Sequence, residues 1–199
     1  MGNVAAKRTS PASVATPQMP GLVLRCLRRL KGVVRHRAVD QLAHALQTAT
    51  RAVHAGADED MVLAALCHDI AKVKSWNGHE VLGAAILRPY VSREASRVVA
   101  THHDFLAIYN VNRSSLDPLD FRRRHRAESW YRTAVVFADE WDSQAYDPAA
   151  HPMSLESFVP LITARFARTL HHPNPREGFA LMRRLAAAGQ LGAARSTAD

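Results

Sequence analysis

The chain has 199 residues, of which 47% are hydrophobic and 22% charged, and a formal net charge of +8. This length and composition are typical of one globular domain and exclude a disordered chain. No apolar stretch approaches the ~20 residues that cross a bilayer, which excludes a membrane span. Two cysteines are too few for a disulfide framework, so we expect buried free thiols at Cys26 and Cys67 in a cytoplasmic protein.

The excess positive charge is confined to one end of the chain. Residues 1–39 hold eight basic side chains and no acidic one, whereas residues 40–199 balance to zero. A protein that binds nucleic acid carries its basic residues over a whole binding face. We therefore expect no nucleic-acid partner.

In chain order, residues 1–20 lack apolar periodicity and are expected to form a disordered tail. The first expected helix lies within 21–37, where apolar residues recur at three- and four-residue spacing and arginines occupy the other side. This basic amphipathic helix would either pack on the core or bind a membrane surface. Residues 187–199 are expected to be a second tail, which leaves one domain at 21–186.

The pattern between the tails is helical throughout. Asp40 is expected to cap a helix that runs to about Ala55 and stops at Gly56. Asp58 or Asp60 begins the next helix. Helices are further expected at about 58–73, 79–87, 93–105, 127–141, 155–170 and 176–187, with a loop at about 107–126. No alternating strand pattern occurs, so the expected fold class is an all-α helical bundle.

Histidine and aspartate residues form a candidate metal site. His68 and Asp69 are adjacent in the apolar run 61–73, where unpaired polar groups are costly, and a metal ion is their natural partner. Imidazoles supply terminal ligands, and a carboxylate can bridge two ions. The residues expected to form a buried dinuclear site are His44, His68, Asp69, His79, His102 and Asp142.

Three segments resemble the HD-domain superfamily. They are LAHALQTATRAVHAGADEDMVLAALCHDIAKV, GHEVLGAAILRPYVSREASRVVATHH and VVFADEWDSQAYDP, and the resemblance covers about residues 36–165. Within the superfamily the chain is similar to the mixed-valent diiron oxygenases, which include organophosphonate oxygenases and, more remotely, myo-inositol oxygenase. The His-x-Leu-Gln motif at His44, the motif that begins at His79 and the pair Trp141–Asp142 carry this closer likeness.

The resemblance implies an HD-domain bundle that holds two iron ions. Asp69 would bridge them, and His79 with His102 would hold the second ion. The ligands of the first ion would be His44, His68, Asp69 and Asp142.

Two ligand positions have alternatives. His103 could replace His102, but the ten-residue step from a helix cap at Ser92 favours His102. Asp139 lies where HD phosphohydrolases place their last aspartate, whereas the Trp–Asp pattern of the oxygenase branch favours Asp142.

Substrate-side roles also follow from the resemblance. Asp69 and Lys72 are the expected catalytic residues, because Lys72 projects from the same helix face as His68 and Asp69 and matches a lysine that myo-inositol oxygenase uses on its substrate. The residues expected to contact substrate are Lys72, Gln47, His103 and Asp104.

The chain departs from the organophosphonate oxygenases at three positions. The lysine, arginine and gating tyrosine of those enzymes are Leu106, Asp139 and Val34 here, which argues against a phosphonate substrate. The arginines of the 107–126 loop, Arg122 among them, would either contact an anionic substrate or form a solvated basic face.

Two functions fit this ligand set. The first is a diiron oxygenase that uses an Fe(II)/Fe(III) pair and O₂ to oxidise a small hydroxylated or anionic substrate. The second is a metal-dependent phosphohydrolase that acts on a nucleotide or phosphate ester with Mn, Co, Fe or Zn. The absence of thiolate ligands argues against a structural zinc site. A non-catalytic protein that binds a partner through 21–37 is disfavoured, because the complete ligand set would then have no use.

Overall fold

The computed structural model describes residues 19–35, 37–109, 117–170 and 175–187. All regular elements among them are helical, which confirms the expected all-α class. The α-helices are α1 (Met19–Arg29), α2 (Gln41–His54), α3 (Glu59–Cys67), α4 (His79–Leu87), α5 (Arg93–Leu106), α6 (Pro118–Arg123), α7 (Tyr131–Val136), α8 (Val159–Phe166) and α9 (Pro175–Ala187). The 3₁₀ helices are η1 (Ile70–Val73), η2 (Ala107–Tyr109) and η4 (Leu155–Phe158), and η3 (Phe137–Asp142) is a π-helix.

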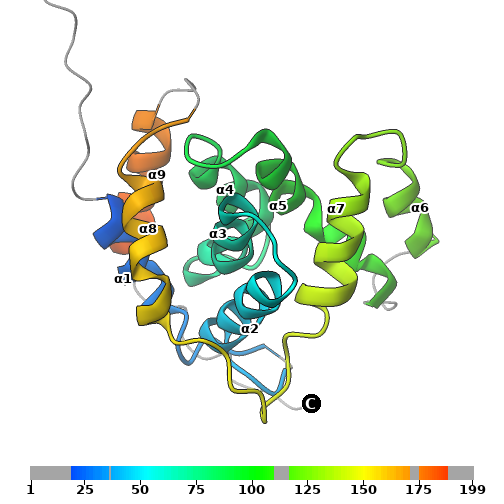
Figure 1. The fold of residues 1–199 in the computed structure, drawn as a ribbon, viewed down its shortest axis with the longest axis horizontal. Helices are drawn as coiled ribbons and strands as arrows, with labels where there is room; N and C mark the ends of the chain where they lie inside the picture. The colour runs from blue at the N-terminus through cyan, green and yellow to red at the C-terminus, as the bar shows by residue number, and fades with distance from the viewer. Residues whose placement is uncertain (1–18, 36, 110–116, 171–174, 188–199) are drawn as a thin grey trace, which may run out of the picture.

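Helices α2 to α5 form the centre of the bundle, as Figure 1 shows. Within this centre α2 packs on α3, and α4 packs on α5. Helices α1, α8 and α9 cover one side, while α6 and α7 lie on the other. The core is built mainly from aliphatic side chains of these helices, and Phe105 and Phe137 are aromatic residues at its fully buried centre.

Side-chain caps fix where the central helices begin. Asp40 accepts a hydrogen bond from the Ala43 amide at 2.8 Å and begins α2, as predicted. Ser92 begins α5 in the same way, as predicted. Of the two candidates for α3, Asp58 is the cap, while Asp60 accepts a hydrogen bond from the Ser92 amide and pairs with Arg165.

The expected helix at 58–73 is divided. Helix α3 ends at Cys67, and His68 and Asp69 form a turn before η1 begins at Ile70. Asp69 has φ −100° and ψ 8°, a bridge conformation that recurs at active sites. The apolar pattern is continuous across this turn because both halves are buried, so hydrophobicity alone does not reveal the break.

The expected loop at 107–126 contains η2 and α6. Asp117 caps α6 by accepting a hydrogen bond from the Leu119 amide at 2.9 Å, and Pro118 occupies the first turn, where its missing N–H is harmless. The expected helix at 127–141 is α7 followed by the π-helix η3. The expected helix at 155–170 begins as η4 and ends at Phe166.

The basic N-terminal helix packs on the core. Its apolar side, with Met19 and Val23, is fully buried, and α1 lies against α8 and α9. Arg29 donates hydrogen bonds to the carbonyls of Leu185 and Ala186 at the end of α9, at 2.8 and 2.9 Å. Helix α1 starts at Met19 rather than 21 because this methionine belongs to the core.

The remaining expectations concern the tails, the cysteines and the membrane. Of the tails expected at 1–20 and 187–199, residues 1–18 and 188–199 lie outside the described residues and stay predictions, whereas Met19, Pro20 and Ala187 belong to helices. Cys26 and Cys67 are buried free thiols, as predicted, and burial raises the pKa of Cys26 to about 11. In the described part of the chain, none of the helices has both the length and the apolar character that a membrane span requires.

Helix α4 approaches the His68–Asp69 turn closely because it carries a glycine there. A Cβ added at Gly83 would lie 2.8 Å from the carbonyl oxygen of His68, closer than real Cβ contacts occur. The backbone of this turn cannot move away easily, since it is fully buried between α4 and the rest of the core.

Replacement of Gly83 by alanine should therefore lower the free energy of unfolding by about 1–3 kcal/mol, because overpacking forces a backbone shift. Chemical denaturation of the purified variant measures this change. Gly21→Ala is the matched control: a Cβ there meets nothing within 4 Å, and alanine favours the helix. Equal stability of the two variants would contradict the close approach.

Candidate dinuclear metal centre

Six buried side chains from five parts of the fold converge on one centre. They come from α2, the turn after α3, the first residue of α4, the middle of α5 and the last residue of η3. None is more than 1% exposed. The structure thus brings together the whole predicted set: His44, His68, Asp69, His79, His102 and Asp142.

The first group in this centre consists of His44, His68 and Asp142. The two imidazole Nε2 atoms are 3.1 Å apart, and His44 Nε2 lies 3.2 Å from Asp142 Oδ1. One ligand atom from each residue lies within 4.8 Å of the others, a spacing that suits one metal ion.

Asp69 connects this group to a second one. Its Oδ2 lies 3.4 Å from His44 Nε2 and 3.2 Å from His68 Nε2. Its other oxygen, Oδ1, lies 2.8 Å from His79 Nε2 and 3.6 Å from His102 Nε2. One carboxylate oxygen therefore faces each group, which is the arrangement of a carboxylate that bridges two ions.

Backbone carbonyls orient all four imidazoles. The Nδ1 atom of each ring lies 2.7–3.0 Å from a carbonyl oxygen. A carbonyl only accepts hydrogen bonds, so each Nδ1 donates a proton to its carbonyl and each Nε2 points into the centre. This is the orientation that metal-binding histidines adopt. The carbonyls, in the order of His44, His68, His79 and His102, belong to Ala145, Ala65, Trp76 and Val99.

Several atoms at the centre lack a hydrogen-bond partner among the described residues. Asp69 Oδ1, His79 Nε2 and Asp142 Oδ2 are fully buried and form no hydrogen bond. A buried polar atom without a partner costs about 1–3 kcal/mol. All three are metal-ligand atoms in the arrangement above, so metal ions would satisfy them. The donor set therefore fits a pair of metal ions.

The electrostatics of the centre also favour cations. Burial alone would lower the pKa of His44, but hydrogen bonds to Asp142 and Asp69 outweigh it and raise this pKa to about 9. Burial pushes the pKa of Asp69 upward, but the charges of His68 and Lys72 hold it well below its usual range. Burial would likewise raise the pKa of Asp142, but the charge of His68 and the hydrogen bond to His44 outweigh it and lower this pKa. Both carboxylates thus stay ionised, and without metal a proton on His44 supplies part of the missing positive charge.

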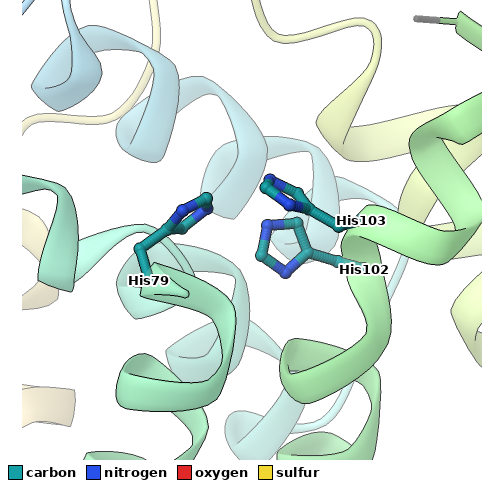
Figure 2. Close-up of side chains that lie close together, drawn as sticks. All are labelled: His79, His102 and His103. Atoms are coloured by element: carbon teal, nitrogen blue, oxygen red, sulfur yellow. The ribbon is translucent and has the colours of Figure 1, made fainter. Parts of the chain in front are cut away.

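His102 and its neighbour His103 have different positions on α5. Figure 2 shows both rings from α5 opposite His79 from α4. His102 is buried and faces Asp69, whereas the His103 side chain is 45% exposed, with its ring 4.5 Å from that of His79. His79, His102 and His103 also form a group of metal-ligand spacing. The geometry favours His102 as the buried ligand and places His103 at the cavity wall.

Asp142 and Asp139 are also separated. Asp139 pairs with Arg122 through both carboxylate oxygens, at 2.5 and 3.0 Å, and accepts a hydrogen bond from the Tyr109 hydroxyl at 2.7 Å. Residues three apart share one face of an α-helix. The wider π-helix η3 instead directs Asp142 into the centre and Asp139 toward α6.

Arg122 corrects the expectation for the 107–126 loop. It is buried, and its guanidinium donates two hydrogen bonds to the Phe105 carbonyl, at 2.6 and 2.8 Å, besides its pair with Asp139. It joins α6 to α5 and η3 and is neither a solvated cation nor a free anion site. Arg122 also lies over the buried Phe105 ring at 5.8 Å, so its contacts with this residue hold the guanidinium inside the protein.

A cavity of about 680 Å³ opens beside the centre. Three of the four expected substrate-contact residues line it: Lys72, His103 and Asp104. Lys72 Nζ lies 2.5 Å from Asp69 Oδ2 and 3.1 Å from Gln41 Oε1. Asp104 pairs with His125 at 2.7 Å.

Gln47, the fourth expected contact, does not line the cavity. Its amide donates to the Asp147 carbonyl at 2.8 Å and accepts from the Asp147 amide at 3.1 Å. Both ends of the amide thus hold the loop after η3, and we do not assign Gln47 to substrate.

The cavity has lining residues that the sequence analysis missed. Gln41 lies three residues before His44 and faces the centre, so the same helix-face argument would have found it. Tyr146 stacks on the His44 ring at 4.2 Å between centroids. No sequence pattern marks Tyr146, because it lies in a loop.

These positions agree with a match to a known family. A family model described as HD domain matches residues 42–144, just over half of the chain. The chain belongs to the HD-domain family. The matched segment begins two residues before His44 and ends two residues after Asp142, so it contains all six side chains of the centre. No curated protein matches the chain. HD domains are generally metal-dependent enzymes, and the groups of metal-ligand spacing agree with that class.

Replacement of Asp69 by asparagine should remove both metal ions, because one carboxylate oxygen faces each group of histidines. Elemental analysis of the variant, purified alongside the original protein, measures metal per chain. Asp139→Asn is the matched control, since Asp139 faces Arg122, and it should keep its metal. Full metal occupancy in Asp69→Asn would overturn the bridging role.

Proposed function

We propose that this HD-domain protein is a non-haem diiron oxygenase that oxidises a small hydroxylated or anionic molecule with O₂. One observation carries the choice between activities. Asp142 of the Trp–Asp pair lies 3.2 Å from His44, whereas Asp139, where phosphohydrolases place their last aspartate, is held by Arg122. This placement supports the oxygenase branch that the sequence resembles.

The ligand set suits iron. Its six side chains offer four imidazoles and two carboxylates, which are ligands that iron accepts. Cys67, the nearest thiol in sequence, is buried inside α3 and belongs to none of the metal-ligand groups. Two iron ions held by these residues would supply the redox chemistry that couples reduction of O₂ to oxidation of the substrate.

The residues around the ions have separate tasks in this proposal. Asp69 would be a ligand of both ions, since its two oxygens face different pairs of histidines. Lys72 donates to Asp69 Oδ2 from the cavity wall, and it would be placed to donate to a substrate oxygen when that carboxylate holds a metal ion. Leu106, Ala107 and Tyr109 contribute apolar surface to the cavity wall, against which a substrate would lie.

A second candidate is a metal-dependent phosphohydrolase, which the HD-domain match itself favours. The same ligands hold Mn, Co or Zn, and such ions activate water for attack on a phosphate ester. The two candidates share the four histidines and Asp69 and differ in the last aspartate, so the bound metal and the products are what an experiment must distinguish.

Electron paramagnetic resonance tests the proposal. Protein loaded with Fe(II) without air, exposed briefly to O₂ and treated with ascorbate should give a signal with g values below 2, the mark of a coupled Fe(II)/Fe(III) pair. Asp142→Asn should abolish the signal, whereas Asp139→Asn should keep it. Absence of the signal, together with turnover of nucleotides or p-nitrophenyl phosphate by the Mn(II) form under argon, would replace the oxygenase with the phosphohydrolase.

Lys72 provides an independent check on the substrate side. Lys72→Met should not lower the metal content, since the lysine competes with metal for Asp69 Oδ2 rather than binding it. Because the ammonium that would contact substrate is gone, substrate affinity should fall by roughly tenfold. Metal analysis and O₂-uptake kinetics measure the two effects. Loss of metal would show instead that Lys72 maintains the centre.

A further inference from the structure

The segment between α1 and α2 places two arginines in the cavity wall. Arg35 and Arg37 line the same cavity as Asp69 and Asp142. Both belong to the basic N-terminal region, whose charge the fold alone does not explain. Among the described residues, no carboxylate oxygen lies within 4.0 Å of either guanidinium, in contrast to Arg122 and Arg165.

Aromatic rings fix the position of both guanidinium groups. Arg35 lies over the Trp76 ring at 5.5 Å, and Lys72 lies over the same ring at 5.1 Å. Arg37 lies over Tyr146 at 4.6 Å, and Tyr146 stacks on His44. A cation–π contact with a ring occupies no N–H group of the guanidinium in a salt bridge, so the N–H groups stay available for a carboxylate or phosphate.

The charged side chains of the cavity wall indicate that a bound anion would be stabilised there. The third cation of the wall, Lys72, is paired with Asp69, and with metal bound it would meet the substrate oxygen at the metal ions rather than a remote group. Of the remaining wall carboxylates, Asp104 pairs with His125, and Asp142 belongs to the metal centre. The three cations and three carboxylates that line the cavity balance one another, so the charge of two bound metal ions would remain uncompensated. A substrate with a single anionic group at the metals leaves the two arginines unpaired.

We propose that Arg35 and Arg37 bind a second anionic group of the substrate, remote from the group that meets the metal ions. The substrate class is then a small dianion, with a carboxylate or phosphate at the arginine end. This inference rests on the proposed metal-dependent function and adds the substrate's charge pattern to it. The cavity volume of about 680 Å³ suits one small molecule and not a polymer.

Calorimetric titration of the Mn(II)-loaded protein with three probes of similar length tests this site. Glutarate and 3-phosphonopropionate carry a second anionic end, whereas pentanoate ends in a methyl group. Both dianions, or one of them, should bind at least about tenfold more tightly than pentanoate, because charge-assisted hydrogen bonds form only with the second anion. Which dianion binds more tightly identifies a carboxylate or a phosphate as the preferred group.

The double variant Arg35→Ala/Arg37→Ala should lose this preference while it keeps its metal content, its thermal stability and its affinity for pentanoate. Arg97→Ala is the matched control, since Arg97 is exposed on α5 and does not line the cavity. Equal affinities for all three probes in the metal-loaded protein, no binding of either dianion, or a preference that survives the double variant would overturn the arginine site and leave the proposed function intact. A protein that takes up no metal would overturn both.

Discussion

The rest of the site depends on the carboxylate of Asp69, which lies between the four imidazoles. One oxygen faces His44 and His68, the other faces His79 and His102, and Lys72 donates to it from the next helical turn. Asp69 reaches this position because α3 ends at Cys67, directly before His68. In a continuous helix the side chains of two adjacent residues would diverge, whereas here both reach one centre. Gly83 of α4 lies against the backbone of this turn, and the packing of α4 thereby sets the position of the ligands.

The protein backbone, rather than the metal, determines how the imidazoles point. Each Nδ1 is held by a carbonyl of its own helix or of a neighbouring loop, so the rings are oriented before any ion binds. The centre is therefore preorganised: four Nε2 atoms and two carboxylates are held close together, an arrangement that bound cations would stabilise. The raised pKa of His44 reflects the same demand for positive charge. The packing of the surrounding helices thus holds buried ionisable groups close together, although their burial without hydrogen-bond partners is costly.

Much of the fold and the centre could be predicted from the sequence, for identifiable reasons. Asp40 and Ser92 cap helices through hydrogen bonds to amides three residues away, so the sequence alone shows where these helices begin. His68 and Asp69 stand out because polar groups in an apolar run need a partner. The break after Cys67, the π-helix that separates Asp142 from Asp139, and the loop residue Tyr146 could not be predicted. Each depends on tertiary packing or on a contact between segments about 100 residues apart in the chain, such as that of Tyr146 with His44.

Among the basic residues of 1–39 that the structure describes, Arg25, Arg28 and Lys31 are exposed, whereas the other three make defined contacts. Arg29 hydrogen-bonds to the end of α9 and helps to hold α1 on the core. Arg35 and Arg37, only a few residues further on, lie on aromatic rings in the cavity wall. Part of the charge excess at the N-terminal end of the sequence thus lies in the wall of the cavity beside the candidate metal centre once the chain is folded. The same aromatic rings contact Lys72 and His44, so whatever binds the two arginines is linked through Trp76 and Tyr146 to both sides of the candidate metal centre.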